Sequence, residues 1–353
     1  MIPYIEVIGK YSLKSFAVIE PSECWFELSY YDIGEFEIYA AATSNNLNAL
    51  KMGNYIKIPN KPYLWLIKSV KYTFNSEGAR MIDVKGFEAK WILNQRVILQ
   101  PYELETMLDV AVTRLVLDNL GEYADESRQI TGFNMDVPDF SITIPKTQAT
   151  RENLSDFVLA LLKANGCGSY TTYENGQINY IAFQGTDKTE SILFSQSMDN
   201  LITADYYESS ENYKTFCRVV STFNENDQSV DYIEDYNMPN APANIDRHET
   251  IIQSNLSTKM KDGTEILPSS NTYKSMQNQE GKNKLAEHKM KKEFNGEIDL
   301  DYSHLTFGED YFIGDLVKVR DEYFGYEGTI RILKFRYKQD ASGYGEEAEY
   351  GTE

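Results

Sequence analysis

The sequence is poor in cysteine, with three in 353 residues. Cys24, Cys167 and Cys217 stand far apart, and none belongs to a CxxC segment. An odd and scattered set argues against a disulfide framework and against a zinc-binding knuckle. We therefore expect each cysteine to be a small buried side chain.

Histidine is equally scarce, and the chain lacks the segments that often mark an active site. His248, His288 and His304 form no HExxH segment, share no helix face and accompany no GxSxG nucleophile. We expect His288 to be solvated on a polar helix. The GCGS segment at 166–169 follows a predicted helix instead of opening one, so it indicates a helix stop and not a phosphate-binding loop.

These absences predict a protein that is not an enzyme, with no catalytic residues, no cofactor-binding residues and no metal ligands. A glycosidase stays open, because two of the 54 acidic side chains could lie about 5–10 Å apart across a cleft without any sign in the linear spacing. Aromatic side chains could line such a cleft, but Trp25 and Trp65 lie in strand patterns that core packing explains.

Long hydrophobic runs are also missing. No apolar stretch approaches the roughly 20 residues that a membrane-spanning helix needs. The first residues, MIPYIEVIGKYSLKSF, show no basic region followed by an apolar run, so they predict no signal peptide. We expect no membrane partner, and synthesis in a cytosol-like compartment.

Basic side chains are too few to balance the acidic ones, and the net charge is −20. Residues 1–95 carry ten of each sign, so the acidic excess lies in the rest of the chain. Such a surface does not hold a phosphate backbone by counterion release, and we expect no stable nucleic-acid binding. It could border a path along which DNA passes without sticking, or it could simply serve solubility.

Residues 1–95 have the alternating pattern of an all-β unit. After a turn at 32–34, Phe36 and Ile38 alternate with polar residues, as in a half-buried strand. The later elements are a one-turn helix at Asn45–Met52 and strands at Tyr55–Ile58, Leu64–Phe74 and Arg80–Gly86. Several short strands joined by glycine turns predict a first small antiparallel β-barrel.

Residues 96–204 change to an α/β pattern. A first helix is predicted from about Pro101, which suits a first helical turn. A second is predicted from about Arg151, with Thr150 as its cap. Asn175-Gly176 between two alternating runs predicts a hairpin.

The remaining residues, 205–353, return to strands. Segments at about 205–235 and 295–353 predict a second β-barrel, interrupted by a turn-rich and helical segment at about 236–294. The helix of that segment is predicted over roughly Tyr273–Phe294. The fold class is therefore β-rich α+β, with two small barrels, an α/β middle domain and a helix-bearing insertion.

The stretch GDLVKVRDEYFGYEGTIRILKFRY at 314–337 predicts the last hairpin of the second barrel. Its apolar residues alternate up to Ile332, and the phase then slips near Leu333, where a β-bulge would keep the apolar side facing inward. We expect four side chains in the barrel cores: Phe36, Ile38, Val317 and Ile330.

The succession of these features resembles the siphophage tail-hub, or tail-associated, proteins of phages and prophages of Gram-positive bacteria, which are similar in fold to the baseplate hub of contractile tails. The segments that carry the resemblance are IGEFEIYAA (33–41), KMGNYIKI (51–58), VKGFEAKWILNQR (84–96), NLSDFVLALLKANGCG (153–168), DNLITADYYESSENYKTFCRVVST (199–222) and FIGDLVKVRDEYFGYEGTIRILKFRY (312–337). They span nearly the whole chain.

The resemblance implies a homotrimer in which each subunit supplies two barrels, so that three chains form a ring of six. Such a hub joins the six-fold tail and its distal tail protein to a three-fold tip, and its lumen passes DNA and the tape-measure protein. Receptor-binding or fibre proteins would be further partners. The expected location is the virion tail tip, after synthesis in the host bacterial cytoplasm, with an origin in a tail-like bacteriocin or injection device left open.

Two other readings of the sequence remain. A receptor- or carbohydrate-binding tip protein would need exposed aromatic side chains clustered in a groove, and a peptidoglycan hydrolase would need a catalytic cleft. Many relatives of this kind continue into a wall-cleaving domain or a fibre, whereas this sequence stops at Glu353. The expectation is that such activities reside on another chain or on residues outside this sequence.

Overall fold

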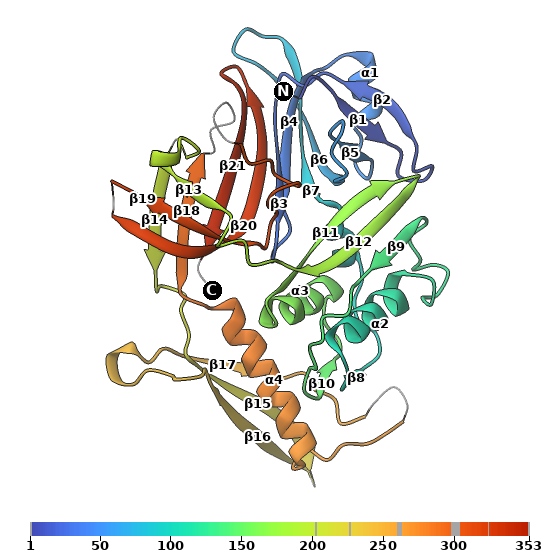
Figure 1. Ribbon diagram of the computed structural model, residues 1–353. Coiled ribbons are helices and arrows are strands. Elements are labelled where there is room, and N and C mark those ends of the chain that lie inside the picture. Colours follow the sequence, from blue (N-terminus) through green and yellow to red (C-terminus); the bar gives the residue numbers. More distant parts are fainter. Residues whose placement is uncertain are drawn as a thin grey trace.

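The computed structural model describes residues 2–201, 203–225, 227–259, 263–297, 304–323 and 325–351. Phe324 of the last predicted hairpin and part of the predicted strand region at 295–353 lie outside the described residues. Figure 1 shows three parts: a large curled sheet, a middle block with two helices beside it, and a small sheet crossed by one long helix.

The large sheet contains 13 strands from both ends of the chain. Those before residue 90 are β1 (Ile5–Ile8), β2 (Ser15–Ile19), β3 (Glu23–Ser29), β4 (Glu35–Ala41), β5 (Tyr55–Lys57), β6 (Trp65–Phe74) and β7 (Arg80–Glu88). The later ones are β13 (Leu193–Ser195), β14 (Thr203–Ser209), β18 (Lys291–Glu297), β19 (Leu316–Asp321), β20 (Tyr326–Asp340) and β21 (Gly343–Gly351). One antiparallel ladder, between β3 and β20, joins the two groups.

The sheet curls at both ends, but the described strands close neither curl into a barrel. Its order runs from β14 through β18, β21, β20, β3, β4, β7, β6, β5 and β1 to β2, with β19 and β13 branching from β20. The two groups also share a single hydrophobic core. The β-rich class is confirmed, and the strands expected in two barrels form one continuous sheet.

The hairpin predicted at 314–337 is confirmed, although it is not the last one, because β21 follows and pairs with β20. β19 and β20 pair in antiparallel register, with Val317 opposite Ile330. The register of β20 against β21 shifts between Ile332 and Lys334, at the position where the sequence predicted a bulge. Because the bulge absorbs the extra residue, Phe335 and Tyr337 remain on the buried side, as Ile330 and Ile332 are. All four predicted core residues, Phe36, Ile38, Val317 and Ile330, are buried.

The middle block follows β7 along the chain. Its elements are η1 (Ala89–Gln95), β8 (Tyr102–Leu104), α2 (Leu108–Leu120), β9 (Phe133–Asp136), β10 (Thr147–Ala149), α3 (Leu154–Ala164), β11 (Cys167–Glu174) and β12 (Gln177–Gln184). The hairpin of β11 and β12 is confirmed, with φ of 52° at Asn175 and 78° at Gly176. Both central residues have positive φ, as a type I′ turn requires.

Both helix starts of the middle block differ from the prediction. The residues after Pro101 form β8, which pairs with β10, so α2 begins only at Leu108. α3 is capped by Asn153, whose side-chain oxygen accepts hydrogen bonds from the backbone N–H groups of Ser155 and Asp156, and not by Thr150. In each case a tertiary contact or a better cap overrides the local signal.

Residues 216–287 form a separate lobe, here called the α4 lobe (Figure 1). It contains β15 (Phe216–Glu225), β16 (Gln228–Asn237), η3 (Asn244–Asp246), β17 (Glu249–Gln253) and α4 (Asn271–Glu287). The sheet order is β16, β15, β17. Two short elements elsewhere complete the description, α1 (Ser44–Ala49) and η2 (Gln196–Met198).

The α4 lobe corrects two expectations. Of the strands predicted at 205–235, only β14 joins the large sheet, because β15 pairs with β16 and β17 instead. The helix predicted to reach Phe294 ends at Glu287, and β18 then pairs with β14 and β21. The chain leaves the lobe at that point and enters the large sheet as β18, between β14 and β21. The domain boundaries themselves remain a prediction.

Tyr30 lies where the sheet, the middle block and the C-terminal strands meet. Its hydroxyl donates to the carbonyl of Gly166 at 2.8 Å and accepts from the backbone N–H of Gly185 at 3.0 Å. A Cβ atom placed on Gly168 or on Gly314 would overlap the ring, so both glycines allow the backbone to approach it. One buried side chain thus contacts segments from three regions of the sequence.

We predict that Tyr30→Phe lowers the free energy of unfolding by about 1–3 kcal/mol, because two buried backbone groups lose their partner. Urea unfolding measures the difference. The matched control is Tyr55→Phe: Tyr55 is also buried, and its hydroxyl has no hydrogen-bond partner within the described residues. Equal effects of the two substitutions would contradict the role assigned to the Tyr30 hydroxyl.

Candidate functional site

A buried ion pair lies between the large sheet and the middle block. Lys90, on η1, donates to the carbonyls of Ser29 at 2.5 Å and Ser169 at 2.7 Å, and its Nζ lies 3.3 Å from Oε2 of Glu88. The other carboxylate oxygen of Glu88 accepts from the backbone N–H of Thr171 at 3.2 Å. The pair therefore bonds β3 on one side and β11 on the other.

The surroundings of this pair suit a structural role better than a chemical one. Burial raises the pKa of Glu88, and the charge of Lys90 opposes the shift. Burial lowers the pKa of Lys90, and the charge of Glu88 opposes that shift in turn. Both side chains are almost completely inaccessible, so a substrate has no route to them. The pair bonds backbone groups of β3 and β11, so we expect it to fix the position of these two strands relative to η1.

The cysteines and histidines do not come together in one site. All three cysteines are buried, as predicted, and burial raises the pKa of Cys24 to about 12, which suppresses its thiolate. His288 is the C-cap of α4, and its carbonyl accepts from the N–H of Lys214 at 2.9 Å. His304 is exposed, and the ring of His248 lies 5.6 Å from that of Tyr213. Within the described ranges no three His, Cys, Asp or Glu side chains could hold a metal ion.

The tryptophans serve packing, as the strand patterns indicated. Trp65 is completely buried, and its indole N–H donates to the carbonyl of Glu27 at 3.0 Å. The indole of Trp25 donates to Oε2 of Glu37 at 3.3 Å, and the ring of Trp91 stacks on Phe87. These rings stabilise the first half of the sheet.

Two cavities among the described residues lie between elements and have polar as well as apolar lining. One of about 840 Å³ borders β9 and β12, and one of about 490 Å³ lies where β20, β21 and the C-terminal ends of α3 and α4 meet. The second is lined by Lys163, Lys289 and Lys334, but also by Glu349, which pairs with Lys334 at 2.9 Å. The charges that line this second cavity largely neutralise one another. The first cavity is lined by the carboxylates of Glu122, Asp136 and Glu174.

Exposed apolar side chains occur at both ends of the large sheet. On β2, Phe16 and Val18 are 54% and 51% exposed, and on β14 Tyr207 is 48% exposed. Tyr72 and Phe74, at the end of β6, are exposed as well. Single exposed apolar residues are ordinary, but a row at a sheet edge is typical of a surface that pairs with another chain.

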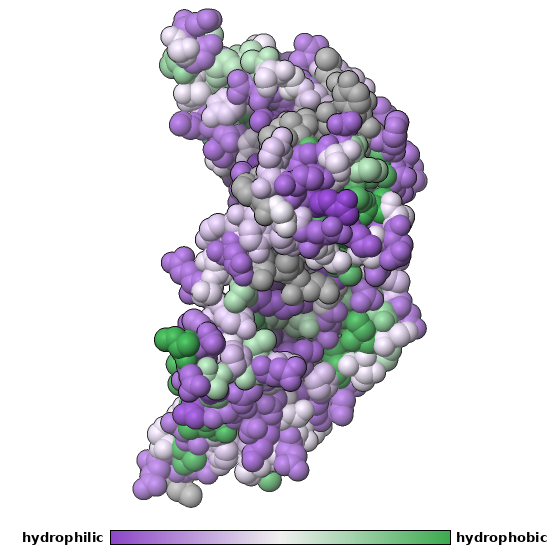
Figure 2. All heavy atoms as spheres, turned by 60° about the vertical axis from the view of Figure 1, so that its left-hand side comes forward, coloured by the Kyte–Doolittle hydropathy of each residue, from purple (hydrophilic) through white to green (hydrophobic). Residues whose placement is uncertain are grey.

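The remaining surface is mainly hydrophilic. Figure 2 shows one face of the molecule, on which hydrophobic side chains form separate patches among hydrophilic ones. None of the helices in the described part of the chain combines the length and apolarity that a membrane crossing requires. The candidate functional surface is therefore the pair of sheet edges, which the sequence predicted as barrel strands but not as edges.

Comparison with known sequences identifies a family. The profile of the Siphovirus ReqiPepy6 Gp37-like proteins matches residues 18–352. No curated protein sequence matches the chain.

Several solved structures share the fold along the whole chain. The 43 kDa tail protein of prophage MuSo2 from Shewanella oneidensis has a TM-score of 0.61 at 12% identity, covering 99% of this chain and 98% of that one. The tail protein from Neisseria meningitidis MC58 has a TM-score of 0.56 at 12% identity, with coverages of 99% and 96%. A type VI secretion component of E. coli, described as similar to the T4 bacteriophage tail proteins gp27 and gp5, has a TM-score of 0.50 at 10% identity, with coverages of 99% and 76%.

We predict that Lys90→Met lowers the free energy of unfolding by roughly 3–5 kcal/mol, because Glu88 is left buried without its partner. Adding Glu88→Gln should restore part of the loss. The control is Lys85→Met, which removes a pair with Glu37 whose lysine is 54% exposed and should cost about 1 kcal/mol or less. Urea unfolding separates the cases, and equal losses from both lysines would refute the structural role.

Proposed function

Because the chain belongs to the family of Siphovirus ReqiPepy6 Gp37-like proteins and has the fold of phage and prophage tail proteins, we propose that it is the trimeric hub of a phage or prophage-derived tail tip. In this proposal the hub joins the six-fold tail and its distal tail protein to a three-fold tip. DNA and the tape-measure protein pass through its lumen. The protein is structural and not an enzyme, and it is located in the virion tail after synthesis in the host cytoplasm.

The observation that carries the proposal is the open ends of the large sheet. Its terminal strands β2 and β14 each pair with one neighbour in the described ladders, and both carry exposed apolar side chains. An edge strand satisfies its backbone groups and covers such side chains when another chain lies against it. Contacts from β2 of one subunit to the β14 side of the next would form a closed head-to-tail ring, in which the two curls of each chain act as the two barrels.

Charge supports a channel that DNA crosses without binding. The net charge is −20, and β20 places lysine and arginine beside carboxylates of its two neighbouring strands, such as Arg336 beside Glu27 of β3 and Lys334 beside Glu349 of β21. These pairs neutralise the basic side chains that would otherwise attract phosphates. A wall of this composition repels a polyanion and lets it slide.

Static light scattering of the purified protein over a range of concentrations tests the proposal. We predict a mass near three times 40.6 kDa, since obligate interfaces bury about 2,000 Å² or more. Phe16→Glu should shift the mass toward the monomer, because it places a charge in the sheet-edge contact. The control is Ile245→Glu, which changes a side chain that is 89% exposed on the α4 lobe and should leave the trimer intact.

Three outcomes would argue against the hub. A monomer at every concentration, unchanged by addition of the distal tail protein, would contradict the trimeric ring. A monomer that also retains glycans in a pull-down would favour a receptor-binding tip protein, and clearing of peptidoglycan in a zymogram would favour a hydrolase.

A further inference from the structure

The α4 lobe is connected to the rest of the molecule by two neighbouring segments of the chain. One is the segment 210–215 before β15, and the other is the segment 288–290 after α4. The N–H of Lys214 donates to the carbonyl of His288 at 2.9 Å, so the two segments lie side by side. Two adjacent connections are the usual geometry of a hinge, about which a domain can turn without breaking its own structure.

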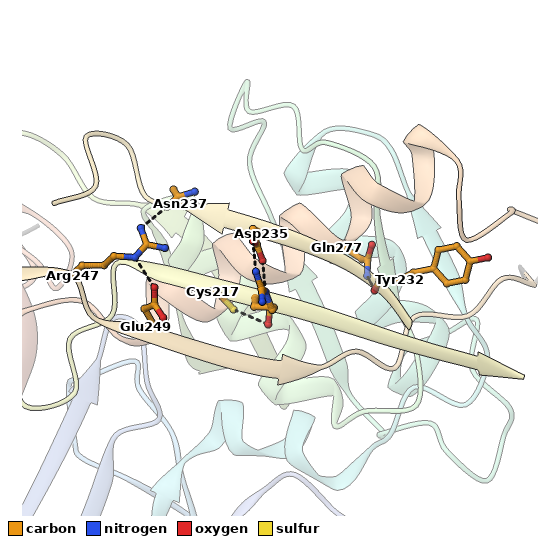
Figure 3. A network of polar contacts seen from close by, with 8 residues as sticks. Cys217, Tyr232, Asp235, Asn237, Arg247, Glu249 and Gln277 are labelled. Carbon is orange, nitrogen blue, oxygen red and sulfur yellow. Dashed lines mark hydrogen bonds and ion pairs between the residues drawn. The ribbon is translucent and has the colours of Figure 1, made fainter. Parts of the chain in front are cut away.

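The lobe itself is tied together by polar contacts, so it would move as one body. Figure 3 shows this network on its small sheet. Arg218 binds Asp235 through two hydrogen bonds of 2.7 Å across β15 and β16. Gln277, on α4, donates to the carbonyl of Tyr232 at 2.9 Å and to the hydroxyl of Ser221 at 3.0 Å, which fixes the helix on the sheet.

The lobe docks on the middle block through α4, which packs against α3 and β10. Beside this contact, Gln148 and Ser257 form a two-bond clasp: the amide of Gln148 donates to the Ser257 carbonyl at 2.8 Å, and the Ser257 N–H donates back to the Gln148 side-chain oxygen. The contact also encloses a cavity of about 200 Å³. The docked position is therefore held by a limited set of contacts.

The charges that face this cavity are mostly of one sign. From the start of α3 come Glu152 and Asp156, and from α4 come Glu280, Lys284 and Glu287. Lys284 donates to a carboxylate oxygen of Glu287 at 2.8 Å, so its positive charge is paired within α4. Three carboxyls remain, and Oε2 of Glu280 is buried without a hydrogen-bond partner among the described residues. An ionised carboxylate in that position would be strongly destabilising.

We propose that protons on Glu152 and Glu280 hold the α4 lobe against the middle block, and that their loss to solvent releases the lobe about the 210–215 and 288–290 hinge. Protonation removes the repulsion between two carboxylates from opposite sides of the contact. Deprotonation restores it, and opening lets both groups hydrate. The device depends only on this chain's own geometry and is independent of the tail-hub assignment.

The direction of the pH dependence follows from the shifted groups. Burial raises the pKa of Glu280 to about 7, and burial together with the nearby Glu280 carboxylate raises that of Glu152 to about 7, from the usual value of 4.5. In the released lobe both groups return toward the usual value. The docked state is therefore fully favoured below about pH 4.5 and loses stability as the pH rises through 7.

Distance measurement between two spin labels tests the proposal. Labels at Glu126→Cys in the middle block and Asp246→Cys on the lobe occupy exposed positions, while the native cysteines are buried. We expect one narrow distance distribution at pH 5.5 and, at pH 8.5, a second broad population that is enriched on the order of tenfold. The combined Glu152→Gln and Glu280→Gln variant should keep the narrow distribution at both pH values.

The control is Glu225→Gln, which removes an exposed carboxylate of the same lobe outside the cavity and should preserve the pH response. A parent protein whose distances are the same at both pH values would overturn the proposal, and so would a double glutamine variant that still opens. The comparison of the two pH values in the labelled protein with both glutamates present is sufficient to overturn the proposal. The test therefore does not depend on whether the glutamine variant folds. Light scattering of the same samples reports the oligomeric state separately.

Discussion

The packing of backbone against the ring of Tyr30 is the constraint on which the arrangement of the whole molecule depends. Tyr30 follows the end of β3, and its hydroxyl bonds the start of the β11 hairpin and the segment after β12. Gly314 brings the C-terminal region against the same ring, where the guanidinium of Arg331 also lies, 5.7 Å from the ring centre. A shift of any one region would open a gap at a site where three regions share one side chain, and close packing makes such gaps unfavourable.

The two junctions of the middle block use buried carboxyls in opposite ways. Toward the large sheet, Glu88 forms an ion pair with the buried Lys90, and both side chains also form hydrogen bonds with backbone groups. Toward the α4 lobe, Glu280 and Glu152 line one cavity, and the described lysine that lines it with them, Lys284, is paired with Glu287. At the first junction, opposite charges lie against each other. At the second, in our proposal, like charges repel each other when the pH is high.

Local patterns in the sequence predicted much of the large sheet and of the hairpins. The alternation around Phe36 and Val317, the bulge after Ile332 and the Asn175-Gly176 turn all follow from side-chain period and turn chemistry. Partner choice was not predictable in this way, because nothing in the strand β15 itself specifies β17 instead of the C-terminal strands. The start of α2 was missed for the same reason: β8 exists only because β10 lies beside it.

The candidate surfaces were less accessible to sequence reasoning than the fold. An alternating strand such as β2 has the same appearance whether it lies at an edge or inside a sheet, so the exposure of Phe16 became visible only in three dimensions. The facing of Glu152 and Glu280 likewise depends on how α4 crosses α3. The acidity of the chain is read directly from its composition. The burial of the cysteines was predicted correctly from their small number and their scattered positions.

The ladder between β3 and β20 has a consequence for how the chain reaches its native state. Arg336 binds Glu27 across 309 positions of sequence, so the ladder joins strands that are synthesised far apart in time. Contacts between such distant positions slow folding, because the intervening chain must first be brought together. During synthesis one side of β3 therefore stays unpaired until β20 emerges, and nascent chains at high local concentration are at risk of pairing with each other there.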